Sequence, residues 1–385
     1  MAFPSRRLRM TVLLSVLVGV SLLAWARWSG AEQFLAPVPF KGKLEAGHGV
    51  VVEAVDLYDP PARLLVARVP RGKGLRLRAL LLDDETPRLR RLGEVAPGAG
   101  ALVAINGDMH RLSGFCAGTT FSTLVDQGRA RVVGSPFSYA CALWVDQEGQ
   151  PHVGALDLQL TLSLPGGAEL PANAELEDGG AWPVLVTRVS GAWRASEQAG
   201  FALTPLGGSW EQGARFRVGK RGDPGTARQG PALLFRAGPG QEALERLKPG
   251  DEVTARLAGA AAGKVATALG TGPRLLEDGQ VAAVLEGQAA DAGWTRRAGR
   301  TAVGVAEKEL ILAVTWQRPR QGLSLLALAR ALQRLGCRDA LNLDGGPSSA
   351  LWADGRVINT PPEGDDPVAS ALFVLPPAQG QPGLR

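Results

Sequence analysis

A short apolar segment near the C-terminal end carries two polar side chains on one face. It reads "ALNLDGGPSSALW" over residues 340–352. Because side chains alternate across a β-strand, Asn342 and Asp344 point to one side while Leu341 and Leu343 point to the other. Burying an amide and a carboxylate without partners is costly. These groups therefore satisfy each other and the following loop, or they bind a ligand.

Asp344 is the first candidate for a catalytic group. A carboxyl group held at the end of a buried strand can act as an acid, a base or a nucleophile. The alternative is a structural aspartate that caps the turn at Gly345 and Gly346. The amides of these glycines, with the hydroxyls of Ser348 and Ser349, could bind the oxygen atoms of a ligand. A plain hairpin loop is the alternative to such a site.

Polar residues also flank other apolar runs. "GALVAINGDMHRLSG" closes on Asn106-Gly107-Asp108, and "RRAGRTAVG" places Arg300 and Thr301 at the start of a strand. A guanidinium can bind two oxygens of an anion at once, so Arg300 is a candidate ligand for one, unless it is a solvated arginine. Asn106 and Asn342 could orient a ligand or the catalytic carboxylate, or they are amides satisfied at strand ends.

The elements that would position these groups can be read from residues 301–359. "TAVGVAEKELILAVTW" predicts two strands around a polar turn at residues 307–309. "LSLLALARALQRLG" has helical spacing, with Ser324 to cap its start and Gly336 to end it. "DALNLD" predicts a strand, and Asp354-Gly355 predicts the turn of a hairpin.

This order of elements is typical of an α+β fold, with mixed β-sheet layers and few helices. We expect the strand at residues 341–344 to be central and buried on its leucine face, with the helix at residues 324–335 packed nearby. Residues 165–230 are rich in glycine and proline and are expected to form an irregular connection or a variable subregion.

The composition allows a large core and argues against one class of partner. The chain has 385 residues, of which 45% are hydrophobic, with 50 glycines and 27 prolines, which favours many short strands and tight turns. The net charge of +5 comes from scattered arginines with acidic residues between them. No lysine-rich run occurs, so nucleic acid is not an expected partner.

The N-terminus predicts export. Three arginines in "MAFPSRRLRM" precede the apolar run "TVLLSVLVGVSLLAWA", which is typical of a secretory signal. An uncleaved membrane anchor is the alternative, because tryptophans at the end of the run could sit at a membrane interface. Residues 1–31 are therefore expected to place the folded part outside the cytoplasmic membrane: periplasmic, extracellular or membrane-anchored. Residues 377–385 are expected to form a disordered tail.

Cysteine and histidine usage is sparse. Cys116 and Cys141 are candidates for a disulfide in an exported protein, whereas Cys337 reads as a small buried residue. The three histidines, His48, His110 and His152, show no paired spacing, so a zinc site and a histidine-dependent triad are not expected. No cofactor is assigned; a divalent cation on Asp344 is conceivable, but no dense run of carboxylates supports it.

Three of these segments, "GRTAVGV", "GLSLLALARALQRLG" and "DALNLDGGPSSAL", together resemble the phosphodiester glycosidase family. The strong similarity covers residues 264–375, and weaker matches at "VAINGD" and "LKPGDEV" extend the expected domain to residues 46–376. The resemblance implies a hydrolase that cleaves a sugar 1-phosphodiester into free sugar and a phosphate monoester. Asp344 and Asp108 would then be catalytic, Arg300 would bind phosphate, and Thr301 beside it and the remaining polar groups would contribute to substrate binding.

The sequence departs from the family pattern at two places. Pro347 stands where relatives tend to have a third glycine, which removes one amide donor from the loop. In "TWQRPRQG", Gln317 and Arg318 replace an Asp-Gly-Arg that many relatives carry. The role of that aspartate is then absent, or it is filled by Asp108 or Asp365.

Two functions of different classes remain open. The first is an exported hydrolase of glycosyl phosphodiesters, acting on cell-envelope or exopolysaccharide material. The second is an inactive protein that binds a polyanionic saccharide in the same cleft. A second carboxylate close to Asp344 would favour the hydrolase. We expect Asn106, Arg300 and Asp344 to converge on one cleft, because loops at strand ends gather into sites.

Overall fold

A computed structural model gives the fold. It describes residues 40, 42–58, 60–83, 88–110, 120–134, 141–174, 183–186, 193–194, 199–222, 227–228, 231–235, 240–287, 292–315, 322–359, 365–378 and 383–385. Lys41–Thr360 together with Gly364–Arg385 form one compact unit, to which all the elements below belong. The expected signal or anchor at residues 1–31 lies outside the described residues. Within the described part of the chain, no helix has the length and apolar character needed to cross a membrane.

An eight-stranded antiparallel sheet contains the strand in which the segment at residues 340–352 begins. Its order is β1-β2-β3-β23-β22-β24-β20-β21. The bounds are β1 Lys43–Gly47, β2 Val50–Tyr58, β3 Pro61–Pro70, β20 Arg274–Glu277, β21 Gln280–Val281, β22 Thr301–Ala306, β23 Glu309–Thr315 and β24 Cys337–Asn342. β24 is an interior strand, and Leu341 and Leu343 are fully buried. The prediction of a central strand buried on its leucine face is confirmed.

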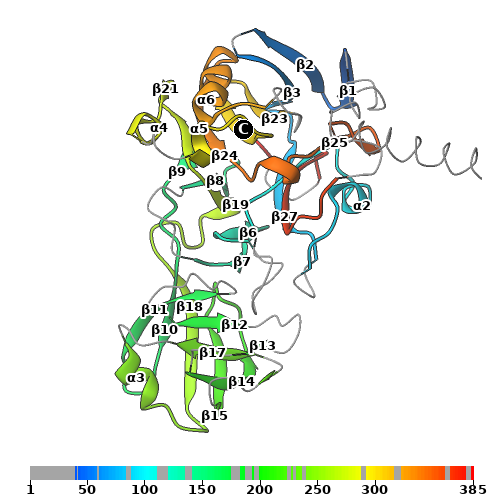
Figure 1. Ribbon diagram of the computed structural model, residues 1–385. Coiled ribbons are helices and arrows are strands. Elements are labelled where there is room, and N and C mark those ends of the chain that lie inside the picture. The colour runs from blue at the N-terminus through cyan, green and yellow to red at the C-terminus, as the bar shows by residue number, and fades with distance from the viewer. Residues whose placement is uncertain are drawn as a thin grey trace, which may run out of the picture. The chain divides into compact units, whose positions relative to one another are not determined.

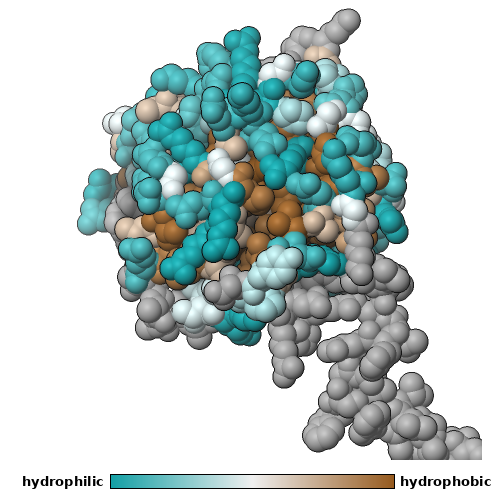
Figure 2. Space-filling model, turned by 90° about the horizontal axis from the view of Figure 1, so that it is seen from above, coloured by the Kyte–Doolittle hydropathy of each residue, from teal (hydrophilic) through white to brown (hydrophobic). Residues whose placement is uncertain are grey.

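One helix covers this sheet as the sequence predicts. α6 spans Leu325–Arg334, and the Ser324 hydroxyl accepts the Ala327 amide at 3.2 Å, which caps the helix start. Leu328 and Leu332 of α6 pack into one core cluster with residues of β3, β22, β23 and β24. Figure 1 shows α6 beside the upper strands, and from above hydrophobic residues appear among polar side chains (Figure 2).

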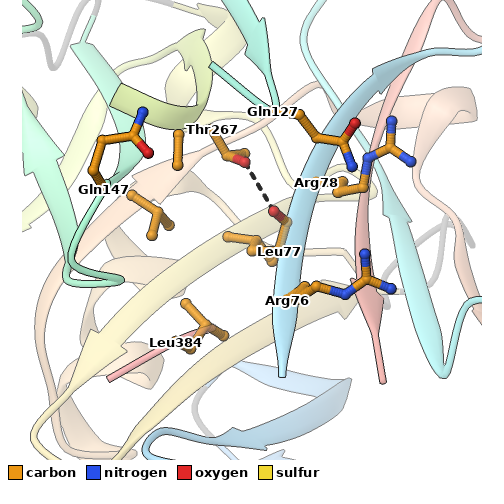
Figure 3. A pocket seen from close by; sticks show the side chains of 9 residues that line it. Arg76, Leu77, Arg78, Gln127, Gln147, Thr267 and Leu384 are labelled. Atoms are coloured by element: carbon orange, nitrogen blue, oxygen red, sulfur yellow. Dashed lines mark hydrogen bonds between the residues drawn. The ribbon is translucent and has the colours of Figure 1, made fainter. Parts of the chain in front are cut away.

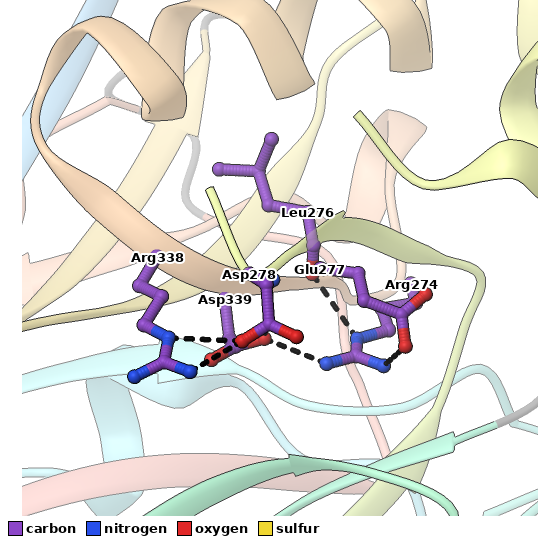
Figure 4. A network of polar contacts seen from close by, with 6 residues as sticks. All are labelled: Arg274, Leu276, Glu277, Asp278, Arg338 and Asp339. Carbon is purple, nitrogen blue, oxygen red and sulfur yellow. Dashed lines mark hydrogen bonds and ion pairs between the residues drawn. The ribbon is translucent and has the colours of Figure 1, made fainter. Parts of the chain in front are cut away.

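A network of charged side chains ties β20 to β24. The Arg274 guanidinium donates to Asp339 of β24 at 2.6 Å and also binds Glu277 (Figure 4). Arg338 binds Asp278, which lies in the turn after β20. These contacts fix the register of β24 on its β20 side, although exposed pairs of this kind contribute little stability on their own.

Two five-stranded sheets contain β5 and β19, whose ends lie near the candidate site residues. One has the order β26-β25-β5-β27-β4 and the other β7-β6-β19-β8-β9. The bounds are β4 Arg76–Leu81, β5 Val103–Asn106, β6 Leu124–Asp126, β7 Arg129–Val132, β8 Cys141–Asp146, β9 Pro151–Gly154, β19 Val265–Thr271, β25 Leu351–Ala353, β26 Arg356–Val357 and β27 Ser370–Leu375. The Thr267 hydroxyl of β19 donates to the Leu77 carbonyl of β4 at 2.8 Å and joins the two sheets. The hairpin predicted at Asp354-Gly355 is present.

A closed barrel corrects the expectation for residues 165–230. Its order is β10-β11-β12-β17-β14-β15-β18, with bounds β10 Gln159–Ser163, β11 Glu169–Ala174, β12 Val184–Val186, β14 Ala199–Gly207, β15 Ala214–Gly222, β17 Ala232–Phe235 and β18 Glu252–Ala258. Ala214, Phe216 and Val218 of β15 alternate into its core. The glycine and proline content hid this alternation, so the prediction of an irregular connection was wrong.

The other elements are short. They are α2 Leu92–Val95, β13 Trp193–Arg194 paired with β16 Ala227–Arg228, α3 Gln241–Glu245, α4 Ala283–Gly287, α5 Ala292–Thr295 and the 3₁₀ turn Gly346–Ser348. The fold is thus rich in β-sheets with few helices, as the sequence predicts.

The C-terminal residues correct a second expectation. Leu384 is buried, its amide donates to the Leu75 carbonyl at 2.7 Å, and its carbonyl accepts the Gly72 amide at 2.9 Å. The Arg385 amide donates to the Gly149 carbonyl at 2.9 Å. The disordered tail expected for residues 377–385 is therefore wrong for residues 383–385. The buried side chain of Leu384 and these main-chain hydrogen bonds hold the C-terminal residues in place, although proline, glycine and glutamine are frequent just before them.

Candidate active site

Asn106, the last residue of β5, joins three segments of the chain. Its side-chain amide donates to the Asp344 main-chain carbonyl at 2.8 Å. Its side-chain oxygen accepts the Thr301 hydroxyl at 2.7 Å and the Ala350 amide at 3.1 Å. Asn106 is fully buried, so it positions the segment that carries Asp344 and does not contact a ligand.

Gly107, between Asn106 and Asp108, lies where the main chain packs closely against Ser370. The Gly107 carbonyl accepts the Asp344 amide at 3.0 Å. A Cβ atom at Gly107 would lie 2.9 Å from the carbonyl carbon of Ser370, which no ordinary side chain tolerates. Asn106 and Gly107 together hold the main chain of Asp344 through both its carbonyl and its amide.

The Asp344 carboxylate is partly exposed and surrounded by polar groups. Its side chain is 18% exposed, and its Oδ1 accepts the Gly345 amide at 2.8 Å. The His110 Nδ1 lies 3.8 Å from its Oδ2. Burial raises the pKa of Asp344, while the Ser348 hydroxyl, His110 and the Gly345 amide partly oppose this rise.

Asp108 is a second carboxyl group beside Asp344. It is 1% exposed, and burial is the main cause that raises its pKa to about 7. The negative charge of Asp344 raises this pKa further. The hydrogen bond of the Asp344 amide to the carbonyl of Gly107, the residue before Asp108, joins the two segments. The Thr271 hydroxyl, the Met109 amide and the Ser122 hydroxyl lie near and partly lower it. Neither oxygen has a partner with good hydrogen-bond geometry within the described residues.

His110 is a site residue that the sequence analysis missed. It follows Asp108 by two positions, and the sequence analysis weighed it only for a zinc site and a histidine-dependent triad, neither of which was expected. Burial lowers its pKa, and Asp344 opposes this only in part, so a neutral imidazole faces the carboxylates at neutral pH. The signal that could have identified it is the Asp-x-His spacing at the end of an apolar strand, which puts both side chains on one face.

Buried polar atoms without partners gather at these strand ends. In the described part of the chain, such side-chain atoms belong to Asp108, His110, Thr271, Asn342, Ser349 and Trp352. The first five of these residues lie at, or within eight positions of, the ends of β5, β19 and β24. Native proteins pair nearly all such atoms, so a concentration of exceptions indicates a functional site.

Arg300 does not act as the sequence predicts. It is 8% exposed, and its guanidinium donates to the main-chain carbonyls of Leu323 at 2.9 Å, Gly293 at 2.7 Å and Arg296 at 2.8 Å. Its aliphatic part borders Gly345, so it lies beside the site. Its donors hold loops together instead of facing an anion. Asn106 and Asp344 are in contact through a hydrogen bond, whereas the guanidinium of Arg300 is directed to main-chain carbonyls; convergence of the three on one cleft stays a prediction.

The expected oxygen-binding loop is also used internally. The Gly345 amide binds the Asp344 carboxylate, and the Gly346 amide donates to the Gly299 carbonyl at 2.8 Å. Ser348 faces Asp344, and Ser349 is buried. Both glycine amides are thus occupied, which corrects the prediction that they bind a ligand. The loop shapes the carboxylate site.

The other residues that were predicted for the site make contacts that stabilise the fold. The Asn342 amide donates to the Gly272 carbonyl at 3.0 Å, and Thr301 is fully buried against Asn106. The Asp365 carboxylate accepts the Gly93 amide at 3.2 Å in the first turn of α2, which is an ordinary capping role. Gln317 and Arg318 lie outside the described residues.

Cys141 carries a free thiol, and its expected partner Cys116 lies outside the described residues. The structure therefore gives no support to the predicted disulfide. Over the described ranges, no group of three or more histidine, cysteine, aspartate or glutamate side chains is arranged to hold a metal ion.

The fold and the paired carboxyl groups define a β-rich protein with a buried acidic site at converging strand ends. Residues 213–375 match the family model of the phosphodiester glycosidases, which confirms the resemblance for this part of the chain. The match includes Asp344, whereas Asp108 and His110 precede it. No curated protein matches the chain.

Two solved structures share the fold at low sequence identity, and a third is less similar. A hypothetical protein from Synechocystis is 21% identical with a TM-score of 0.73; the match covers 88% of this chain and 64% of that one. A putative exported protein from Burkholderia pseudomallei is 18% identical with a TM-score of 0.64, over 82% of this chain and 74% of that one. The catalytic domain of zebrafish N-acetylglucosamine-1-phosphodiester alpha-N-acetylglucosaminidase, auto-inhibited by its pro-peptide, is 12% identical with a TM-score of 0.43, over 88% and 84%.

Proposed function

We propose that this protein hydrolyses the bond between the anomeric carbon of a sugar and a phosphodiester. Water is consumed, the carbon–oxygen bond breaks, and the products are a free sugar and a phosphate monoester. The observation that carries the proposal is the pair formed by Asp108 and Asp344, in which one carboxyl group has its pKa raised to about 7. Hydrolysis at an anomeric carbon is characteristically performed by two carboxyl groups.

The exposures of the two side chains suggest different tasks. Asp344 is 18% exposed and can touch a bound sugar, whereas Asp108 is 1% exposed and stands behind it. Asp344 is therefore the catalytic carboxyl group. Asp108 is a positioning residue that holds a proton near neutral pH and thereby sets the ionisation of its neighbour, because interacting carboxyl groups titrate as a pair.

The chemistry demanded of Asp344 is modest. A phosphate group leaves readily, so strong acid assistance to the leaving oxygen is not required, and the main need is to attack the anomeric carbon or to activate water. Both tasks use the ionised form. The Gly345 amide and the Ser348 hydroxyl lower the pKa of Asp344 against the effect of burial, which favours that form.

We also propose that the protein acts outside the cytoplasm. The support is the sequence of residues 1–31, with its basic start and apolar run. A substrate in cell-envelope or exopolysaccharide material would suit that location.

The test is direct hydrolysis. The purified full chain is incubated with a panel of sugar 1-phosphodiesters that differ in sugar and in aglycone, and free sugar is measured by mass spectrometry. Asp344→Asn serves as the matched control. Release of sugar by the parent but not by the control is expected. Tight binding of the panel without any release, in both proteins, would contradict the proposal and support the saccharide-binding alternative.

A further inference from the structure

Three side chains at every second position of one segment act on Asp344. The Asn106 amide binds the Asp344 main-chain carbonyl, and the charge of Asp344 acts on the carboxyl group of Asp108. The third is His110, whose Nδ1 lies 3.8 Å from the Asp344 Oδ2. The end of β5 and the residues that follow it therefore meet Asp344 both at its main chain and at its carboxylate.

The main chain around His110 is held by a neighbouring segment. His110 forms an isolated antiparallel bridge with Thr120, and the Phe121 amide donates to the Met109 carbonyl at 3.0 Å. Thr120 is fully buried, and its hydroxyl donates to the Ser122 carbonyl at 3.0 Å. The imidazole therefore projects from a fixed backbone, and its distance from Asp344 is set by the fold.

The ring nitrogen of His110 that faces Asp344 has no hydrogen bond. The side chain is 9% exposed, and its Nδ1 is buried without a partner among the described residues. A hydrogen bond from a nitrogen to a carboxylate measures about 2.7 to 2.9 Å, so the two atoms are about 1 Å too far apart. Since an unpaired buried nitrogen is costly, a second state in which this pair closes would explain it.

The Asp344 carboxylate is fixed at its other oxygen. Its Oδ1 accepts the Gly345 amide at 2.8 Å, while Oδ2 is the oxygen nearer to His110. The Ser348 hydroxyl also acts on the carboxylate. Arg300 borders Gly345, but its guanidinium binds main-chain carbonyls. The imidazole is thus the titratable group placed to give Oδ2 a donor.

A neutral imidazole can supply that donor. Burial lowers the pKa of His110, and Asp344 opposes this only in part, so at neutral pH one ring nitrogen carries a proton and the other does not. A proton on Nδ1 would point at the Asp344 carboxylate, whereas a lone pair there would be repelled by it. The titratable groups that act on one another here are His110, Asp344 and Asp108. The surroundings therefore favour the tautomer that is protonated on Nδ1.

We propose that His110 is a positioning residue for Asp344. Its Nδ1–H donates to Oδ2 and, together with the Gly345 amide on Oδ1, holds the carboxylate ionised and directed toward the substrate. Hydrogen bonds of this kind are often long in the free enzyme and shorten when substrate binds. The kinetic consequences rest on the proposed hydrolysis, whereas the tautomer is a property of the protein alone.

The tautomer is tested first, because this test needs no substrate. The full chain is labelled with ¹⁵N-histidine, and the imidazole nitrogens are observed by NMR at about pH 7.5, where a neutral ring is expected. The chain has three histidines, and the signals lost in His110→Phe identify this one. Protonation on Nδ1 is expected in the parent, and protonation on Nε2 in Asp344→Ala, which removes the acceptor. Protonation on Nε2 in the parent, or no change in Asp344→Ala, would overturn the proposal.

Three substitutions then separate positioning from proton transfer. His110→Asn keeps an N–H group at the place of Nδ1, His110→Gln moves it to the place of Nε2, and His110→Phe keeps a ring without a donor. We expect kcat to fall by about 100-fold in His110→Phe and His110→Gln, but by less than about tenfold in His110→Asn. KM should stay unchanged, because the imidazole contacts the carboxylate and not the substrate. Equal losses of kcat in His110→Asn and His110→Phe would contradict a positioning role.

The pH profile distinguishes a lost hydrogen bond from lost packing. The lower of the two steps in kcat reports the ionisation of Asp344, and a donor on its carboxylate lowers that pKa. This step should move up by about one pH unit in His110→Phe and stay in place in His110→Asn. An unmoved step in His110→Phe would reduce His110 to a packing residue. If the parent releases no sugar, the hydrolysis fails, and the tautomer alone decides the contact with Asp344.

A second histidine–aspartate pair provides the matched control. The His152 Nε2 lies 2.9 Å from the Asp146 Oδ2, and Asp146 pairs with Val265, at the opposite end of β19 from Thr271. The next residue, Gln147, lines a separate pocket of about 240 Å³ (Figure 3). His152→Phe should leave kcat and its pH profile unchanged. A loss of kcat as large as that in His110→Phe would show that the effect does not arise at Asp344.

Discussion

The Asn106 side-chain amide donates to the Asp344 main-chain carbonyl at 2.8 Å, across 238 positions of the sequence. The neighbouring Gly107 carbonyl accepts the Asp344 amide. The end of β5 therefore holds the main chain of Asp344 on both sides of the residue that carries the proposed catalytic carboxyl group. Asp108 directly follows Gly107 in the sequence. The contacts of Asn106 and Gly107 that position Asp344 therefore also bring the second carboxyl group to it.

We expect Asp344→Asn to lower the rate of sugar release by about two to four orders of magnitude, the usual range for a positioned acid or base. Asparagine can still accept the Gly345 amide, so the melting temperature should change little. Asp365→Asn is the control, because Asp365 is also buried but caps α2. A stability loss with full specific activity of the folded fraction would show that Asp344 is only a turn cap.

Asn106→Ala should destabilise the protein and misplace Asp344. The change leaves the Thr301 hydroxyl, the Ala350 amide and the Asp344 carbonyl without a partner, at about 1 to 3 kcal/mol for each buried group. A small displacement of Asp344 should lower kcat by about 100-fold, with KM nearly unchanged.

Asn359→Ala provides the matched control for this change. Asn359 is buried and makes two hydrogen bonds of 2.7 Å to the same segment, at Leu351 and Ser349, without touching Asp344. Urea unfolding should show comparable losses for both variants, whereas kcat should fall only in Asn106→Ala. Equal kcat values in the two variants would reduce Asn106 to a purely structural residue.

Local patterns explain why much of the site's framework could be predicted. The alternation around Leu341 and the helical spacing after Ser324 depend on neighbours in sequence, and both are found as expected. Asp344 at a strand exit follows from the same alternation. The barrel strands were missed because their alternation is short and interrupted by glycine and proline. Closure of the barrel also depends on the pairing of β10 with β18, which lie far apart in sequence.

At the site, the sequence did not predict which groups each polar side chain contacts. Arg300 has the chemistry of an anion ligand, yet the carbonyls of Leu323, Gly293 and Arg296 occupy it. Nothing in the residue type indicates which acceptor a guanidinium finds. His110 was missed for the converse reason, because its role arises from its 3.8 Å approach to Asp344, a contact created only by folding.

Arg300→Lys tests the structural role assigned to that arginine. Lysine cannot reproduce the planar fork that reaches three carbonyls, so the free energy of unfolding should fall by about 1 to 3 kcal/mol. KM for a phosphodiester substrate should stay unchanged. Arg296→Lys, at an exposed side chain, is the control for stability. A KM raised more than about tenfold at parental stability, as for a lost charged contact, would restore Arg300 as a phosphate ligand.

Asp108→Asn should change how stability depends on pH. Folding raises the pKa of Asp108 from 3.8 to about 7, so between these values the folded state binds more protons than the unfolded state. The favourable contribution of the protonated group is complete below about pH 4 and is lost as pH rises through about 7. Asparagine cannot ionise, so the variant should escape this loss.

Parent and variant should therefore unfold at similar urea concentrations at pH 4, and Asp108→Asn should become the more stable protein by pH 8, by an amount on the order of a few kcal/mol. Urea unfolding from pH 4 to 8 measures the difference directly. The same ionisation should appear near pH 7 in kcat/KM of the parent and disappear in the variant, because Asp108 sets the charge next to Asp344. Parallel stability curves over this range would mean that Asp108 is ionised throughout, and Asp108 would then not hold the proton that the proposed mechanism assigns to it.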